Sequence, residues 1–328
     1  MAATTFVLYE LTLDLLGSKD ANGKALATCP THGEGNNRAL RIWRKADGGT
    51  VCKCFGGCDW RDVHDWLCSK LGIQSTEATP REVDEAEMKR RADLRRESEA
   101  KAERNRVRAV TRVKTVLKIS DHVTEHGYLV KKGVQPTPTL RQIPLLKLLR
   151  VIQYHPKDRN GDKLRGDVLI VPVKCGDTFT SIEMIDGDGR KSALAGGEKV
   201  GGFWATQKLP DAREVLLVGE GVATCLSASQ CSGYPAIATL SVSQLERVVR
   251  LMQARYPASK IVVLADLDKS GEPHTEAVRV SKEFDTFLGL PGGEGGCELA
   301  EMDFNDLHLM CGIQSVQTAI QKALEQKR

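Results

Sequence analysis

Val215-Leu-Leu-Val-Gly-Glu-Gly221 and Ile261-Val-Val-Leu-Ala-Asp-Leu-Asp268 are two apolar runs that each end in acidic residues. Between them the sequence predicts a helix over 222–231, a short strand over 236–239 and an amphipathic helix over 243–255. Alternating buried strands and helices are typical of a parallel sheet with helical crossovers. Because the carboxyl ends of parallel strands share one edge of the sheet, we expect Glu220, Asp266 and Asp268 to converge there.

These three carboxylates indicate a metal site. Clustered carboxylates repel one another unless a cation lies between them, and oxygen ligands suit Mg²⁺ or Mn²⁺ better than zinc. A single Asp after a strand more often caps a helix or turn. The repeated pattern, Gly-Glu-Gly after one strand and Asp-x-Asp-x-x-Gly after another, favours a catalytic metal site for phosphoryl or nucleotidyl transfer.

At these residues the sequence resembles a known family. Gly219-Glu220-Gly221 and Asp266-Leu-Asp268-Lys-Ser-Gly271 resemble the Toprim domain, which bacterial-type primases, type IA and type II topoisomerases, some nucleases and recombination mediators share. The resemblance covers residues 211–309 and implies that Glu220 acts as an acid or metal ligand and that Asp266 and Asp268 bind metal. Asp303-Phe-Asn-Asp306 resembles the acidic motif that closes the domain in phage and plasmid primases, which adds Asp303 and Asp306 to the implied Mg²⁺ or Mn²⁺ ligands. Many relatives carry a further Asp shortly after the Glu, whereas this chain reads Gly-Val-Ala-Thr there.

A second motif lies in the first 60 residues. Cys29-Pro-Thr-His32 is followed, across a short hairpin, by Cys52-Lys-Cys54-Phe-Gly-Gly-Cys58. Two such ligand pairs are typical of a zinc ribbon. Cys29 and His32 form the first pair, and two of the three later cysteines complete the set.

The segment 29–67 resembles the zinc domain of bacterial primases. Its knuckle Cys54-Phe-Gly-Gly-Cys58 is similar to the family's Cys-Phe-Gly-Cys, with one additional glycine, and implies Cys29, His32, Cys54 and Cys58 as the ligands of a structural Zn²⁺. The sequence leaves open whether Cys52 replaces Cys54 as a zinc ligand. Between the pairs, Arg41, Trp43 and Arg44 interleave charge with an aromatic ring, as proteins that bind single-stranded nucleic acid do. Trp43 packing beneath the ribbon is the alternative.

Composition limits the class of protein. The chain has 328 residues, 47 basic against 43 acidic, a net charge of +4 and a pI of about 8.5. The overall charge alone does not indicate nucleic-acid binding. No signal peptide or membrane-spanning apolar run is present, so we expect a cytoplasmic protein whose ten cysteines are reduced or metal-bound.

The middle of the chain predicts a tether and a basic subdomain. Residues 81–118 are strongly charged and suit a solvated helix or a disordered tether, with a phosphate-tracking arm as a minor alternative because the balance turns basic after Lys101. We expect a helix over 121–132 and strands over 167–173 and 178–185. The region 151–209 resembles the basic half of the bacterial primase core. That resemblance nominates Arg165, Lys191 and Lys199 for template or nucleotide binding; surface ion pairs are the alternative for each.

These features together predict a multi-domain α/β (α+β) protein. Its expected parts are a zinc ribbon (1–73), a charged helical linker (74–120), a mixed β-rich basic subdomain (121–209) and a Toprim Rossmann-like parallel sheet with a C-terminal helix (210–328). Their order resembles a bacterial-type primase from a phage, plasmid or other mobile element. The resemblance implies RNA primer synthesis from ribonucleoside triphosphates on a single-stranded DNA template, with a replicative helicase as a further partner. The alternatives are a non-catalytic single-stranded-DNA-binding accessory protein and a Toprim nuclease.

Overall fold

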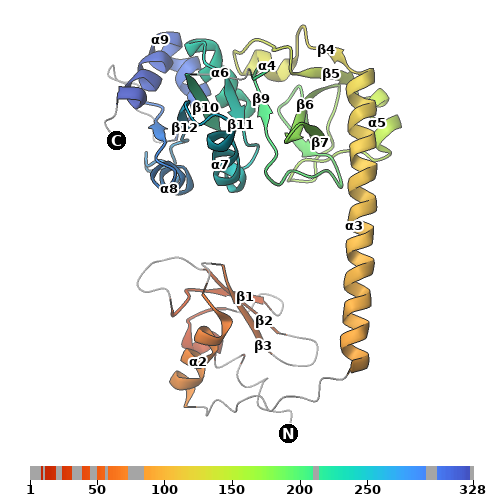
Figure 1. The fold of residues 1–328 in the computed structure, drawn as a ribbon, viewed down its shortest axis with the longest axis vertical. Coiled ribbons are helices and arrows are strands. Elements are labelled where there is room, and N and C mark those ends of the chain that lie inside the picture. Colours follow the sequence, from red (N-terminus) through yellow and green to blue (C-terminus); the bar gives the residue numbers. More distant parts are fainter. Residues whose placement is uncertain are drawn as a thin grey trace. The chain divides into compact units, whose positions relative to one another are not determined.

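The computed structural model divides the chain into two compact units, residues 1–92 and 93–328 (Figure 1). It describes residues 9, 12–19, 24–31, 39–44, 50–55, 58–72, 85–209, 214–292 and 301–325. Each unit is described by itself below. None of the described helices is long and apolar enough to cross a membrane.

The described residues of the first unit include a three-stranded antiparallel sheet and a helix that packs on it. The strands are β1 (Lys24–Ala27), β2 (Leu40–Arg44) and β3 (Thr50–Cys54), in the order β1-β2-β3. Helix α2 (Trp60–Leu71) begins after Asp59, whose carboxylate accepts a hydrogen bond from the Arg61 amide. Alternate residues of β2, Leu40 and Ile42, are fully buried against α2. The small sheet therefore has one core face, as its period-two pattern requires.

Helix α3 (Glu85–Ile119) spans most of the expected linker. Residues 101–108 are all exposed, whereas Ala109, Val113 and Val116 are buried in a core cluster of the second unit. Their spacing of four and three places them on one helix face. The last turns of the predicted tether are thus part of a core.

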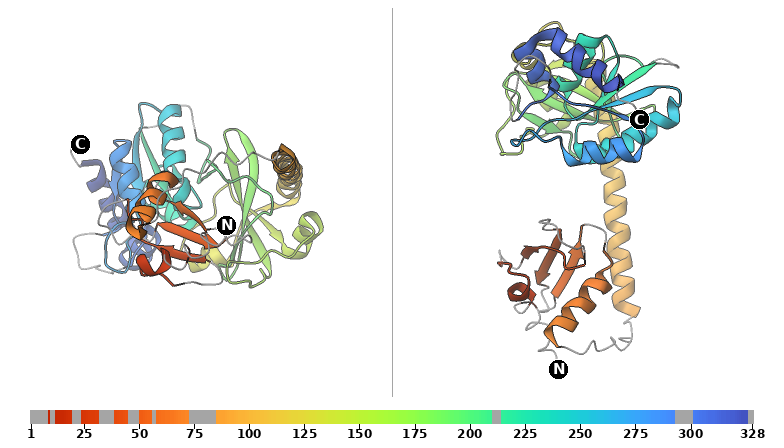
Figure 2. Two further views of the ribbon diagram at one scale, coloured as in Figure 1. Left: turned by 90° about the horizontal axis from the view of Figure 1, so that it is seen from below. Right: turned by 90° about the vertical axis from the view of Figure 1, so that its left-hand side faces the viewer.

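The second unit opens with a five-stranded antiparallel sheet of order β4-β5-β6-β7-β8. Its strands are β4 (Asp121–His122), β5 (Arg141–Pro144), β6 (Asp167–Cys175), β7 (Thr178–Asp186) and β8 (Lys191–Ala193). Strand β6 is buried on both faces: Val168 and Ile170 pack with α3 and α5 (Leu145–Ile152), while Leu169 and Val171 face the rest of the unit. Figures 1 and 2 show α3 and α5 together on the outer side of this sheet.

The helix expected over 121–132 is shorter than predicted. Asp121 and His122 pair with β5 instead, and the helix α4 covers only Gly127–Lys131. His126 ends the extended segment and caps α4, accepting a hydrogen bond from the Tyr128 amide at Nδ1. The pairing of β4 with residues twenty positions away is a non-local contact that helical periodicity cannot reveal.

Helix α4 lies between two neighbours. At its start, a Cβ on Gly127 would meet the Gly187 Cα and carbonyl oxygen at 3.2 Å, so the backbones of α4 and the β7–β8 turn are in contact. At its end, the Lys132 carbonyl accepts a hydrogen bond from the side chain of Asn305 (2.7 Å). Helix α4 therefore connects the β7–β8 turn to α9 (Phe304–Glu325).

The second sheet has the order β13-β12-β10-β11-β9, parallel except for β9. Helices α6 and α9 cover one face and α7 and α8 the other (Figure 1). The elements are β9 (Trp204–Ala205), β10 (Val215–Gly219), α6 (Val222–Ser232), β11 (Ala236–Ala238), a short 3-10 turn (Val242–Gln244), α7 (Leu245–Arg255), β12 (Lys260–Leu264), α8 (Thr275–Glu283) and β13 (Phe287–Gly289). The parallel sheet with helical crossovers agrees with the sequence analysis.

The two five-stranded sheets are joined through β9. Phe203 and Lys174 exchange both backbone hydrogen bonds (2.9 Å each), and β9 then pairs with β11. Leu169 and Val171 of the first sheet share one apolar core with Leu217 of the second. The described residues of the second unit thus form one hydrogen-bonded and packed body.

Candidate functional site

Glu220 and Asp266 lie at the carboxyl edge of the parallel sheet. Glu220 directly follows β10 and Asp266 follows β12 by two residues, and the two strands pair through Val218 and Val263. Both side chains line a small cavity together with His274. His274 was not singled out by the sequence analysis; only its place just before α8 and six residues after Asp268 marks it.

Asp303 and Asp306 join this edge from the first turn of α9. The Asp303 carboxylate accepts hydrogen bonds from the amides of Asn305 (2.6 Å) and Asp306 (2.8 Å), and the Asp306 carboxylate accepts one from the Asp303 amide (3.1 Å). This reciprocal arrangement caps the helix. The Thr224 hydroxyl donates to the other Asp303 oxygen (3.2 Å). Thr224 belongs to the run 221–224, which follows Glu220 and contains no acid.

Asp266 is the electrostatic centre of the cluster. Burial is the largest cause that raises the pKa of its carboxyl group, followed by the negative charges of Asp303, Glu220 and Asp306, and together they raise it to about 7. Its Oδ1 atom is buried and has no hydrogen-bond partner among the described residues. A buried acceptor without a donor, surrounded by three other carboxylates, fits a cation.

Asp268 is held differently from the other acids. Its Oδ1 accepts hydrogen bonds from the Ser270 amide (2.8 Å), the Ser270 hydroxyl (2.5 Å) and the Glu272 amide (3.2 Å). These hydrogen bonds lower the pKa of its exposed carboxyl group. Asp268 is not among the charges that act on Asp266. The structure therefore brings together Glu220, Asp266, Asp303 and Asp306, with Asp268 in an adjoining hairpin.

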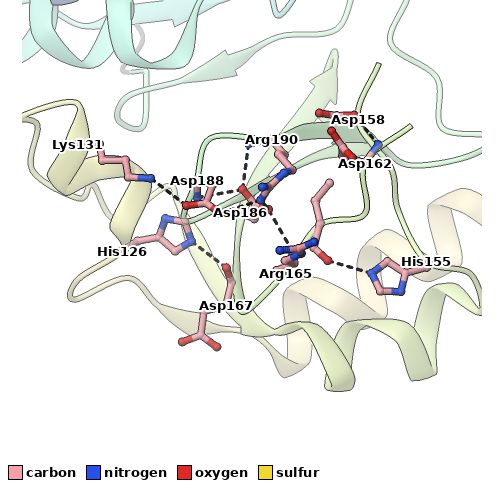
Figure 3. A network of polar contacts seen from close by, with 11 residues as sticks. His126, Lys131, His155, Asp158, Asp162, Arg165, Asp167, Asp186, Asp188 and Arg190 are labelled. Carbon is pink, nitrogen blue, oxygen red and sulfur yellow. Dashed lines mark hydrogen bonds and ion pairs between the residues drawn. The ribbon is translucent and has the colours of Figure 1, made fainter. Parts of the chain in front are cut away.

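The hairpin of Asp268 occurs three times in the second unit. Asp158 Oδ1 accepts from the amides of Asn160 and Asp162, and Asp186 Oδ1 accepts from those of Asp188 and Arg190. In each case the fourth residue is a glycine with a positive φ: 91° at Gly161, 93° at Gly189 and 78° at Gly271. A first-position Asp shapes all three turns. Figure 3 shows the side chains of Asp158 and Asp186 in the first two.

A second cavity, of about 500 Å³, lies beside the Asp186 hairpin. Its lining includes Arg165 and His126 together with the acids Asp167 and Asp188, which Figure 3 shows. The Arg165 amide donates to Asp186 (3.2 Å), and its exposed side chain makes no ion pair with the described acids. Burial lowers the pKa of His126, whose Nε2 donates to the Asp167 carbonyl (3.1 Å).

The other two basic candidates are Lys191, on β8, and Lys199, in the segment that follows β8. Lys191 is exposed, with Nζ 5.6 Å from the ring centroid of Tyr128. Lys199 forms an ion pair with Glu183 (2.9 Å). Arg190, which the sequence analysis did not select, pairs with both Asp186 (3.0 Å) and Asp188 (2.8 Å).

Three cysteines gather in the first unit. The Sγ atoms of Cys29, Cys54 and Cys58 lie within 4.8 Å of one another, and no other described trio of Cys, His, Asp or Glu meets that criterion. Tetrahedral zinc places two thiolates roughly 4 Å apart, so three thiols at this spacing fit a zinc ion. His32, the fourth implied ligand, lies outside the described residues.

Cys52 is near this cluster but outside the trio. Burial raises the pKa of the Cys52 thiol, and the charge of Cys29 adds to the effect. Burial likewise raises the pKa of Cys29. In the second unit Cys311 is disulfide-bonded, so the expectation that every cysteine is reduced or metal-bound is wrong for that residue.

The candidate template residues of the first unit lie on β2. The exposed Arg41 guanidinium is 5.0 Å from the ring centroid of Phe55, and Arg44 is 4.6 Å from that of Tyr9. Trp43 is half-buried, which leaves part of its ring exposed. The expected alternation of charge and aromatic surface is therefore present on this strand.

Comparison with known proteins places the acidic edge in a family. A family model described as Toprim domain matches residues 215–314. Among solved structures, the Aquifex aeolicus primase (zinc-binding and RNA polymerase domains) is 12% identical, with a TM-score of 0.45 over 98% of this chain and 83% of that one. The DnaG primase catalytic domain bound to single-stranded DNA is 13% identical, with a TM-score of 0.45 over 67% and 80%. The primase fragment of the bacteriophage T7 primase-helicase is 12% identical, with a TM-score of 0.38 over 62% and 80%.

The family match begins with β10 and includes Glu220, Asp266, Asp303 and Asp306. These are the acids that the structure gathers at one edge of the parallel sheet. The part of the chain that carries the acidic cluster is therefore similar to the Toprim domain.

Proposed function

We propose that this protein is a DNA primase that synthesises short RNA primers on single-stranded DNA by metal-dependent nucleotidyl transfer. The observation that carries the proposal is the state of Asp266, whose buried Oδ1 lacks a partner while three further carboxylates act on it. A carboxylate in this state can bind a cation. A cation at the acidic edge of a Toprim domain would in turn support phosphoryl or nucleotidyl transfer. The cysteine trio of the first unit adds a second, structural metal.

Glu220, Asp266, Asp303 and Asp306 would hold Mg²⁺ or Mn²⁺, with Asp268 as a further ligand from its hairpin. When bound, the metal orients the triphosphate, lowers the pKa of the attacking 3′-hydroxyl and neutralises the leaving pyrophosphate. No three of these acids bring their carboxylate oxygens within 4.8 Å of one another, as the three thiols do. The site is therefore open, and substrate phosphates would complete the coordination, as Mg²⁺ sites commonly require.

The residues around the edge would bind substrate and move protons. Glu220, half-exposed beside Asp266, is placed to accept the proton of the attacking hydroxyl. Arg165 and Lys191 carry exposed charges for template and triphosphate. Lys199 could bind template or nucleotide only after its ion pair with Glu183 is broken. It is therefore the weakest candidate of the three basic residues.

The first unit would bind the template. Cys29, Cys54 and Cys58, with His32 as fourth ligand, would hold Zn²⁺ and fix the β2–β3 hairpin. Arg41 and Arg44 would meet phosphates, and the exposed part of Trp43 would stack on a base. The domain limits proposed from the sequence, 1–73, 74–120, 121–209 and 210–328, assign this role to the first.

The wider biological setting follows from the same proposal. The partners would be a single-stranded DNA template, ribonucleoside triphosphates and a replicative helicase, in the cytoplasm of a bacterium or a phage-infected host. A phage or plasmid is the proposed source because the closing motif at Asp303 and Asp306 resembles theirs.

A non-catalytic single-stranded-DNA-binding protein is the competing function. The open spacing of the acids favours it, since a protein that only binds DNA has no need of a tight metal cage. Against it stands the unsatisfied burial of Asp266, which costs stability unless a cation compensates it.

Primer synthesis on circular single-stranded DNA separates these functions. Labelled ribonucleotides with Mg²⁺ or Mn²⁺ are expected to yield short products with the wild type, and at least a hundredfold less with Glu220→Gln, which keeps the shape and removes the charge. Glu272→Gln, at an exposed acid of the neighbouring hairpin, is the matched control and should retain activity. DNA binding without products from any variant would establish the accessory protein, and loss of the template would establish the nuclease.

A further inference from the structure

A cavity of about 540 Å³ lies where the two five-stranded sheets of the second unit meet. Its walls come from β6, β7 and β9, from the ends of α3 and α7, and from the segments around Pro138 and Lys208. The volume is within the 300–1,000 Å³ typical of small-molecule sites. No residue assigned so far to metal, template or nucleotide binding lines it.

The cavity and the acidic edge lie at opposite ends of the parallel strands. Strand β9 runs antiparallel to β11: Trp204 pairs with Ala238, whereas the Thr206 amide bonds to the carbonyl of Ala236. Gln207, Lys208 and Leu209 therefore follow β9 toward the amino ends of the parallel strands. Arg255, at the end of α7, precedes the amino end of β12. Glu220 and Asp266 follow the opposite ends.

The lining combines an apolar floor with aromatic rings. Pro172, Phe203 and Trp204 are largely buried and form part of it, and Phe179 is half-buried. Trp204 is 2% exposed, and its indole Nε1–H has no hydrogen-bond partner among the described residues. Flat apolar walls with an unsatisfied donor favour a planar ligand that carries acceptors.

Cations outnumber acids around this floor. Arg141 is held by the Ser120 carbonyl and by His122, neither of which neutralises it. Lys174 Nζ lies 4.8 Å from the Phe179 ring centroid, and no described carboxylate is within ion-pair distance of Lys174 or of the exposed Lys208.

Asp177 is the one acid among the described lining residues, and it is 92% exposed. Its pair with Arg255 spans 3.6 Å. An exposed pair of that length contributes little and is easily exchanged for another anion. Four basic side chains against one loosely held carboxylate leave a surplus of positive charge at the cavity.

We propose that this cavity binds a free nucleoside phosphate, with the base on the apolar floor beside Phe179 and the phosphates on Lys174, Lys208 and Arg255. Both halves of the ligand contribute to its binding. The aromatic rings contact the planar base, and the lysines contact the negatively charged phosphates. Because the site lies at the sheet edge opposite the acids, it is a second nucleotide site, independent of metal-dependent transfer.

Calorimetric titration of ATP into the full chain, without added Mg²⁺ or Mn²⁺, tests the proposal. We expect one ATP per chain, with affinity lowered about tenfold or more by Lys174→Gln and by Lys208→Gln, since each loses a charged contact. Lys282→Gln, an exposed lysine of α8, is the matched control and should bind like the wild type. Adenosine and inorganic tripolyphosphate should each bind at least tenfold more weakly than ATP. The Lys208 position is exposed, so its variant reports on binding without disturbing the core.

Four results would overturn the proposal. They are absence of ATP binding, ATP binding that both pocket variants leave unchanged, tripolyphosphate binding as tight as that of ATP, and pocket-dependent binding of oligo(dT) without binding of ATP. The last would assign the cavity to a nucleic-acid strand. None of them bears on primer synthesis by the acidic edge, because the titration omits the metal and spares Glu220.

Discussion

At the scale of single residues, Asp268 combines two tasks that mutation can separate. Its Oδ1 holds the hairpin through Ser270 and Glu272, and its negative charge is proposed to assist the metal. Asparagine keeps the Oδ1 acceptor and removes the charge, whereas alanine removes both. We expect Asp268→Asn to unfold at the wild-type temperature and to lose at least tenfold in primer synthesis. Asp268→Ala should lose activity and also unfold a few degrees lower.

Asp158 supplies the control for this comparison. It shapes the same kind of hairpin, with amide bonds from Asn160 and Asp162, and is not among the charges that act on Asp266. Asp158→Ala should lower the unfolding temperature like Asp268→Ala and leave primer synthesis intact. Full activity in Asp268→Asn would reduce Asp268 to a turn residue.

The acids at the strand ends could be predicted from sequence, but the difference between them could not. Glu220 and Asp266 follow apolar runs buried on both sides, and that pattern is local. The distinction between Asp266 and Asp268 depends on burial among Asp303 and Asp306, which arrive from α9. A residue such as His274 reaches the edge only through the tertiary structure.

At the scale of elements, α3 presents a basic stripe. Lys101, Arg104 and Arg108 are exposed, fall three and four residues apart on one helix face, and have no ion pair with a described acid. Arg106, on another face, pairs with Glu103 and Glu198 (3.0 Å each). The stripe therefore has free charge for phosphates, whereas Arg106 does not.

Replacing all three stripe residues with glutamine should weaken single-stranded DNA binding in a salt-dependent way. Each phosphate contact contributes about 0.7 to the slope of log affinity against log salt, so the loss of three should reduce the slope by roughly 2. Arg106→Gln should leave the slope unchanged. Fluorescence anisotropy over a salt series measures both, and an unaltered slope in the triple variant would remove α3 from the binding surface.

Sequence patterns predicted some elements and misplaced others for a physical reason. The apolar spacing of residues 274–288 predicts a single helix. In the structure this helix ends at Glu283, because Asp285 takes a positive φ of 48° and Phe287 then pairs with Val262 of β12. Helical periodicity continued through β13 because its buried residues fit either period. The sequence also predicts a short strand over 297–301, and that segment lies almost wholly outside the described residues.

At the scale of the whole molecule, the two units have cores of different size. The first relies on a few residues such as Leu40, Ile42 and Val63 around the cysteine trio, whereas the second has three large apolar clusters. Small cores commonly need a metal to stay folded. We expect the purified chain to contain one zinc, and its removal to unfold the first unit while the second keeps its stability.

Cysteine variants identify the ligands. Cys54→Ser should lose the zinc measured by elemental analysis, whereas Cys52→Ser and the matched control Cys68→Ser should retain it, because neither Cys52 nor Cys68 belongs to the trio. Hydrogen exchange on the zinc-free protein should show fast amides in the first unit only. Zinc loss in Cys52→Ser with retention in Cys54→Ser would exchange the two assignments.

The contact between Gly127 and Gly187 has a consequence for how the chain tolerates genetic change. A methyl group at position 127 would press on the Gly187 backbone at 3.2 Å, whereas one at position 187 would stand 3.9 Å from Gly127. The two positions therefore differ in the substitutions that they tolerate. Position 187 can change to alanine in evolution. Position 127 must stay glycine as long as α4 lies between the β7–β8 turn and the acidic edge.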